Sequence, residues 1–169
     1  MLTVSGPDRP GLVETLSQAV ANHRGSWLES RMARLEGHFA GVLRVSVPEE
    51  QVDALTRALQ SLEPESLQIS VVRSELKPPA SDARKLRLEI LGSDRPGIVR
   101  DISQALADRS INVDELRTEI ISAPMSGELL FLANAELQIP ADLDLDLLRK
   151  DLEALAHELM VDVDLDEPL

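Results

Sequence analysis

The chain contains an internal repeat with a spacing of 86 residues. Residues 6–13, Gly-Pro-Asp-Arg-Pro-Gly-Leu-Val, return at 92–99 as Gly-Ser-Asp-Arg-Pro-Gly-Ile-Val. Ten of the sixteen positions between 6 and 21 are identical to their partners 86 residues later. Composition alone would match about one position in ten, so the repeat indicates a duplicated unit. The 169 residues therefore predict two domains of about 80 residues each rather than one.

The first copy has hydrophobic patterns that alternate between strand and helix periods. A short apolar strand over 2–5 precedes the repeated loop, and a helix ended by Gly25 follows it. The inward face of that helix is predicted to hold Leu12, Val13, Leu16, Ala19 and Val20. Period-two alternation then predicts strands and a second helix in the order 27–35 (strand), 38–47 (strand), 49–62 (helix) and 67–71 (strand).

The second copy repeats this order after a linker. Residues 75–85 include Pro78-Pro79 and show no periodicity, which gives domains at 1–74 and 86–169. A strand from Leu86 leads into the second loop, and the next helix turns Ile98, Val99, Ile102 and Leu106 inward. Later elements fall at 111–121 (strand), 128–139 (strand), 144–158 (helix) and 160–165 (strand). The order β-α-β-β-α-β predicts an α+β fold of two ferredoxin-like domains, each an antiparallel sheet with both helices on one face.

Composition excludes several classes of function. The chain has no Cys, which removes disulfides, thiol nucleophiles and zinc–thiolate sites. No apolar run reaches the roughly 20 residues of a membrane span, and the start has no signal-peptide pattern, so we expect a cytoplasmic protein. The net charge is −13, of which residues 86–169 contribute −12. Such a surface repels nucleic-acid phosphates and leaves a basic protein partner as an open possibility.

The repeated loop has a structural and a functional interpretation. In the structural one, the first glycine lets the chain leave the strand sharply, the aspartate accepts backbone N–H bonds, and the second glycine lets the helix lie close to the sheet. In the functional one, free N–H groups at the helix N-terminus and the guanidinium of Arg9 or Arg95 bind a small carboxylate. The loop is neither a Walker loop nor a dinucleotide-binding Gly-x-Gly-x-x-Gly.

A duplicated β-α-β-β-α-β unit with this loop resembles the ACT-domain family of amino-acid-sensing modules. A tandem pair without a catalytic domain is similar to the transcriptional repressors of the glycine cleavage system. The resemblance implies a regulatory protein without enzymatic activity or a cofactor. It would bind a small amino acid, with glycine as one candidate, and modulate a transcriptional regulator without touching DNA itself. It also implies that ligands lie at an interface between two ACT domains.

The resemblance also implies a set of ligand-binding residues. From the first copy it selects Asp8, Arg9, Pro10, Gly11, Leu12 and Val13. From the second copy it selects Asp94, Arg95, Pro96, Gly97, Ile98 and Val99, together with Asn112 and Val113 at the start of the next strand. The first copy has Ser26-Trp27 in place of Asn112-Val113, and a bulky Trp27 could fill the site. We therefore expect the second copy to be the better ligand site.

Other polar groupings favour ordinary surface structure. Asp142, Asp144, Asp146 and Glu153 have part of a calcium-loop spacing, but Leu147 stands where the loop needs Gly, so a solvated helix start is the favoured interpretation. We expect Arg117 to be solvated or to contact a partner rather than to pair with Glu115.

Three hypotheses remain. The leading one is a sensor that associates into a homo-oligomer, such as a dimer, because open sheet edges favour pairing. The second is a scaffold whose loops are turns and bind no ligand. The third is an enzyme, which no nucleophile–base set, metal site or cofactor motif supports.

Overall fold

We describe the fold from a computed structural model, which describes residues 1–62, 67–73, 84–123 and 127–166. Contacts divide the chain into two compact units, Met1–Lys77 and Pro78–Leu169. Residues 75–83 of the expected linker lie outside the described residues, as do residues 124–126 of the expected hairpin turn. Arg84 and Lys85 were expected in the linker, but they form the start of a strand.

The first unit follows the predicted order of elements, and their bounds lie close to those expected. They are β1 (Leu2–Pro7), α1 (Leu12–Asn22), β2 (Ser26–Leu35), β3 (His38–Ser46), a 3₁₀ turn (Glu49–Gln51), α2 (Val52–Gln60) and β4 (Gln68–Val71). The strands form an antiparallel sheet in the order β2-β3-β1-β4. Strands β2 and β4 are therefore the two edges of this sheet.

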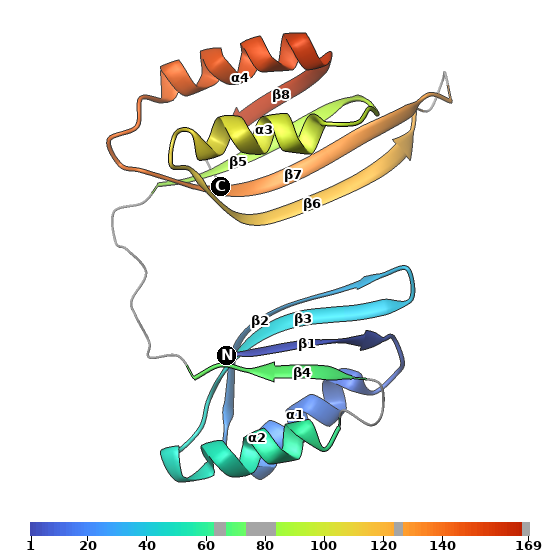
Figure 1. Cartoon of the computed structure of the whole chain (residues 1–169), viewed down its shortest axis with the longest axis vertical. Coiled ribbons are helices and arrows are strands. Elements are labelled where there is room, and N and C mark those ends of the chain that lie inside the picture. The colour runs from blue at the N-terminus through green and yellow to red at the C-terminus, as the bar shows by residue number, and fades with distance from the viewer. Residues whose placement is uncertain (63–66, 74–83, 124–126, 167–169) are drawn as a thin grey trace. The chain divides into compact units, whose positions relative to one another are not determined.

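The second unit has the same plan. Its elements are β5 (Arg84–Ser93), α3 (Ile98–Ala107), β6 (Asn112–Ser122), β7 (Leu129–Ile139), α4 (Leu145–Leu159) and β8 (Val161–Asp166). The sheet order is β6-β7-β5-β8, so β6 and β8 are its edges. In each unit both helices cover the same face of the sheet (Figure 1). The predicted α+β fold of two ferredoxin-like units is confirmed.

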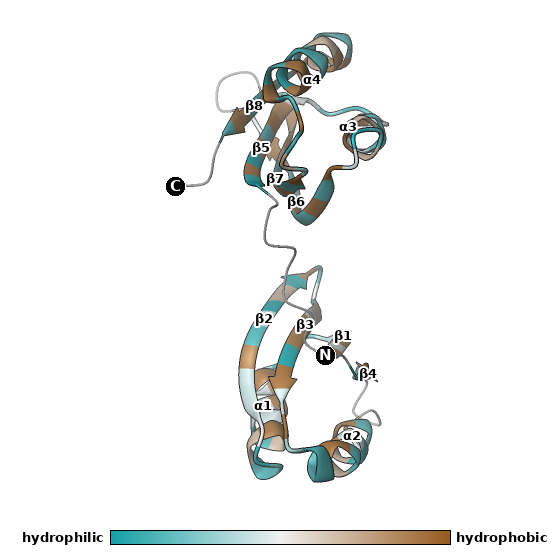
Figure 2. Ribbon diagram, turned by 90° about the vertical axis from the view of Figure 1, so that its left-hand side faces the viewer, coloured by the Kyte–Doolittle hydropathy of each residue, from teal (hydrophilic) through white to brown (hydrophobic). Residues whose placement is uncertain are grey.

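Each unit has its own hydrophobic core between its helices and one sheet face. Polar and apolar residues alternate along strands such as β3 and β5 (Figure 2), which leaves the other sheet face to solvent. In the first unit Leu2, Leu16, Leu43 and Leu59 are almost fully buried. In the second unit the corresponding layer is formed by Leu88, Ile102, Leu137, Leu148 and Leu152.

Two residues expected on inward helix faces are exposed instead. Val13 and Val99 are 48% and 43% exposed, although the helical pattern placed both beside buried neighbours. Each follows a buried first residue of its helix, and one residue step turns a side chain by about 100° around the helix axis, to the side of the buried stripe. Val13 and Val99 are equivalent positions of the repeat, so this exposure is common to both units.

The glycines of the repeated loop act differently from the structural interpretation. Gly6 and Gly92 lie inside the first strand of each sheet, paired with Phe39 and Phe131, and do not form a sharp exit. Gly11 and Gly97 cap the following helices with φ values of +90° and +102°. Residues with a side chain rarely adopt this left-handed conformation, so the second glycine is required by the backbone rather than by close packing of the helix.

The end of the first helix is also made differently from the prediction. The left-handed residue there is Arg24, with φ +56°, and not Gly25. Gly25 instead gives room to α1, because a Cβ on it would lie 2.8 Å from a side-chain carbon of Val20. The equivalent of Arg24 in the second unit is Ser110, which has φ +57°.

Candidate functional site

The repeated loops join the first strand to the first helix of each unit and are tied to the neighbouring hairpin. The Asp8 backbone N–H donates to the Gly37 carbonyl at 2.8 Å, and the Asp94 N–H donates to the Leu129 carbonyl at 3.1 Å. In the second unit, the Ser93 hydroxyl also donates to a Glu128 carboxylate oxygen at 2.7 Å. These bonds fix each loop at the hairpin end of its sheet.

The two loop aspartates differ in their partners. The Asp8 carboxylate is paired with the Arg34 guanidinium, with 2.8 Å between Oδ2 and Nε. The structural interpretation, in which this carboxylate accepts a turn N–H, is wrong for Asp8. Within the described part of the chain, the exposed Asp94 carboxylate makes no hydrogen bond or ion pair.

Strand register explains the difference between the aspartates. Arg34 lies opposite Phe39, which in turn lies opposite Gly6. Across the repeat, the residue that occupies the place of Arg34 is Ile120, opposite Phe131. The second unit therefore has an apolar side chain where the first has the cation that neutralises its loop.

The helix that follows the second loop begins beside a cation. Neither Gly11 nor Gly97 is accompanied by a side-chain hydrogen bond that caps its helix. A guanidinium nitrogen of Arg100 lies 3.2 Å from the position that a Cβ on Gly97 would occupy. The Arg100 Nε donates to Asp101 at 2.7 Å, and this hydrogen bond lowers the pKa of the Asp101 carboxyl and raises the pKa of Arg100. The start of α3 therefore combines a helix N-terminus, which favours an anion, with an arginine–aspartate pair, and the Asp101 Oδ2 lies 3.4 Å from the same Cβ position.

Arg95 contacts the end of α4. Its Nη2 donates to the Glu158 carbonyl at 3.2 Å, at the C-terminal end of α4. A cation is favourable there because the last carbonyls of a helix carry partial negative charge. Its Nε is buried and has no partner among the described residues. Arg95 thus ties the loop to α4, and Arg100 is the guanidinium at the helix start.

The structure separates two groups that sequence reasoning placed in one site. Asn112 lies opposite Gln138, which lies opposite Lys85 at the beginning of β5. Asp94 follows the other end of β5, about 30 Å away at about 3.3 Å per strand residue. No single amino acid can span this distance. The Asn112 side-chain amide donates to the Asp114 carboxylate at 2.8 Å, and Asn112 is exposed.

The edge strand β6 carries an apolar strip on its helix-facing side. Leu116 and Ile120 lie opposite the buried residues Ala135 and Phe131, yet they are 47% and 49% exposed. Val113, near the start of the strand, is 37% exposed. In the first unit, Ser30 and Arg34 take the places of Leu116 and Ile120. At these two positions the second unit therefore has exposed apolar side chains where the first unit has polar ones.

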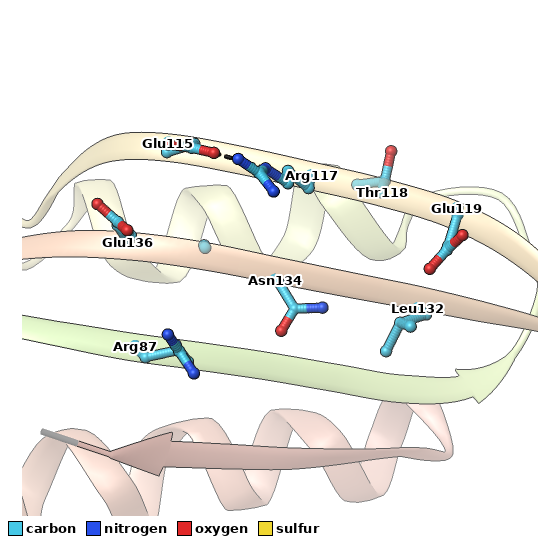
Figure 3. Close-up of a pocket in the computed structure, with 9 residues that line it drawn as sticks. Arg87, Glu115, Arg117, Thr118, Glu119, Leu132, Asn134 and Glu136 are labelled. Carbon is cyan, nitrogen blue, oxygen red and sulfur yellow. Dashed lines mark hydrogen bonds and ion pairs between the residues drawn. The ribbon is translucent and has the colours of Figure 1, made fainter. Parts of the chain in front are cut away.

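A hollow of about 550 Å³ lies on the open face of the second sheet, away from the loops. Its lining carries both signs of charge, with Arg87 on β5, Arg117 and Glu119 on β6 and Glu136 on β7 (Figure 3). Arg117 was expected to be solvated or to contact a partner, but its Nε donates to Glu115 at 2.6 Å. The lining contains one hydroxyl side chain, Thr118, and no Ser, Cys, His or Lys.

The remaining groupings are structural where they are described. Asp144 caps α4, and its carboxylate accepts N–H bonds from Asp146 at 3.0 Å and Leu147 at 3.2 Å. The favoured interpretation of a helix start is confirmed. The described residues contain no cluster of three or more His, Asp or Glu side chains arranged to hold a metal ion. Across the same residues, every helix is too short or too polar to cross a membrane.

Comparisons with known proteins agree on the architecture. The ACT-domain family matches residues 1–72 and again residues 86–157. The UPF0237 protein MK1213 of Methanopyrus kandleri is 31% identical over 74 residues, which cover 44% of this chain and 77% of that protein.

Two solved structures match nearly the whole chain. A protein of unknown function from Galdieria sulphuraria is 34% identical, with a TM-score of 0.88 over 99% of this chain and 96% of that one. A provisionally assigned glycine cleavage system transcriptional repressor shares the fold at 20% identity, with a TM-score of 0.70 over 98% of this chain and 94% of that one. The chain belongs to the ACT-domain family and carries two of these domains in tandem.

Proposed function

We propose that this protein is a regulatory sensor that binds a free α-amino acid at the loop of its second ACT domain. The observation that carries the proposal is the pair of opposite charges on that loop and the helix after it. Asp94 supplies a carboxylate without a partner in the described residues, and Arg100, which is paired with Asp101, lies in the first turn of α3. An amino acid is a zwitterion, so its ammonium group would bind Asp94 and its carboxylate the helix start.

A second chain completes this site in the proposal. Asn112 lies at the far end of the sheet from Asp94, so one domain cannot present both to a ligand. If two β6 edges pair antiparallel, the first residue of one strand lies beside the last residue of the other. Asn112 of one chain then lies at the end of the sheet that carries the Asp94 loop of the other chain. The exposed apolar residues Leu116 and Ile120 would be covered in this arrangement, which supports β6 as the associating edge.

The proposed output is a change in contacts with another protein. A ligand held across an interface stabilises that interface by its differential affinity for the associated state. The fold likeness to the glycine cleavage repressor makes glycine the first amino acid to test, and a transcriptional regulator the first partner to test. The acidic charge of the second domain disfavours direct contact with DNA.

A thermal-shift screen against the twenty amino acids tests ligand binding. At a concentration of about 100 Kd, a ligand should stabilise the protein by about 2.7 kcal/mol and raise the unfolding midpoint by several degrees. The N-acetyl derivative of the best amino acid lacks the ammonium charge, and its amide lacks the carboxylate. We expect neither derivative to shift the midpoint. If no amino acid gives a shift, the sensor proposal is wrong and a scaffolding role is favoured.

Substitutions then test whether two chains share the site. Because a hydrogen bond to a charged group contributes about 1.5–3 kcal/mol, Asp94→Asn should weaken binding about 10- to 100-fold without changing stability. Asn112→Ala should weaken binding as well. In a mixture of the two variants, a heterodimer contains one site with both native residues, so calorimetry should recover binding at part of the wild-type stoichiometry. A mixture that binds no better than its components would place both residues outside a shared site.

A further inference from the structure

We propose that the two ACT domains have diverged into one ligand-binding domain and one that is closed by its own side chains. The inference rests on the proposed function and adds a stoichiometry of one amino acid per chain. It comes from comparing positions that the 86-residue repeat makes equivalent. Three such differences affect the ammonium pocket, the carboxylate pocket and the strand that approaches the ligand.

The ammonium pocket of the first domain is already filled by a cation. The Arg34 Nε lies 2.8 Å from the Asp8 Oδ2, which is the contact that a ligand ammonium would otherwise make. A ligand would have to displace a covalently tethered guanidinium, whose effective concentration beside Asp8 is far above that of a free metabolite. In the second domain Ile120 holds this position and cannot compete for Asp94.

The carboxylate pocket is charged differently in the two domains. In the second domain the Cβ position of Gly97 lies 3.2 Å from a guanidinium nitrogen of Arg100 and 3.4 Å from a carboxylate oxygen of Asp101, and these two side chains are paired with each other. In the first domain the equivalent residue is Glu14, whose carboxylate oxygen is 4.0 Å from the Cβ position of Gly11. This carboxylate can itself occupy the positive end of α1 and repels the carboxylate of a ligand.

The strand start also differs. Trp27 is half-buried and packs against the hydrophobic core of the first unit, where the second unit has the exposed Val113. The neighbouring residue is Ser26 in place of Asn112, which removes the side-chain amide. All three differences act in the same direction, and each is independent of the others in sequence.

Exchange of these residues between the domains tests the inference. Calorimetry with the amino acid that gives the largest thermal shift should yield one site per wild-type chain. Ile120→Arg places an internal cation beside Asp94 and should weaken binding at least 10-fold. Ile120→Gln is the matched control, because it removes the same apolar side chain without adding charge, and it should bind at least several-fold more tightly than Ile120→Arg. The double variant Glu14→Arg, Arg34→Ile should gain affinity in the first domain.

The outcomes separate this inference from the proposed function. If wild type binds no amino acid, the proposed function fails and this inference fails with it. The proposed function would remain, but the division between domains would be wrong, if wild type binds two amino acids per chain or if Asp8→Asn weakens binding as much as Asp94→Asn. Equal affinities of Ile120→Arg and Ile120→Gln would also overturn the inference. One site per chain, with clearly weaker binding in Ile120→Arg than in Ile120→Gln, supports it.

Discussion

Replacing Gly92 with alanine is expected to destabilise the second domain by about 3 kcal/mol, the upper part of the range for overpacking. A Cβ at this position would lie 2.7 Å from the Cα of Val161 and 2.9 Å from the carbonyl oxygen of Met160. Both obstacles belong to the backbone where α4 turns into β8, so no side-chain rotation can relieve them. Urea unfolding followed by circular dichroism measures the loss.

Gly41→Ala is the matched control in the first domain. It is also a strand glycine, but its Cβ would meet the Cγ of Met32 at 2.7 Å, and the nearest backbone atom is the Arg31 carbonyl oxygen at 3.3 Å. A methionine side chain can change rotamer, and alanine lowers the entropy of the unfolded chain. We therefore expect a change within about 1 kcal/mol. If Gly92→Ala lowered the free energy of unfolding as little as Gly41→Ala, β8 could move away from β5 at little cost.

Leu137→Ala should also unfold the second domain at much lower urea, with a loss of about 2–5 kcal/mol. The side chain is 0% exposed in β7, between its helices and the neighbouring strands, so its removal leaves a cavity. The single Trp of the chain, Trp27, lies in the first domain. Tryptophan fluorescence therefore follows the first domain, while circular dichroism follows both.

Leu129→Ala tests whether burial is the cause. Leu129 lies in the same strand but is 58% exposed, and its truncation should change stability by less than about 0.5 kcal/mol. The comparison holds residue type and strand constant. A small effect of Leu137→Ala would mean that the core can collapse around the deletion.

The repeat and the hydrophobic periods were sufficient to predict the order of elements and the sheet faces. Local patterns are strong there because each strand has one buried face and each helix one buried stripe. They were wrong at Val13 and Val99, since both lie at the margin of the apolar stripe, where periodicity does not determine whether a side chain is covered. Gly6 and Gly92 were also misassigned, because a glycine inside a strand, such as Gly92 with its close approach to Val161, has the same sequence signature as one in a turn.

The candidate site was less predictable. The resemblance selected the loop residues, but the opposite ends of the sheet on which Asp94 and Asn112 lie follow from strand register, which the sequence does not state. The roles of Arg34, Arg100 and Glu14 were missed altogether. A signal for them was present, because all three are charged positions where the repeat is not identical. Interpreting it required knowing which of these positions face the loop.

The separation of Asp94 from Asn112 has a consequence for how such a sensor would respond in a cell. Under the proposed arrangement, every bound amino acid needs two chains, so occupancy depends on the amount of protein as well as on the amount of metabolite. At low copy number the chains would be mostly apart, and more amino acid would be needed to bring them together. At high copy number the chains would already be associated, and a lower metabolite level would fill the sites. Expression level would then set the threshold of the sensor, without any change in the residues that touch the ligand.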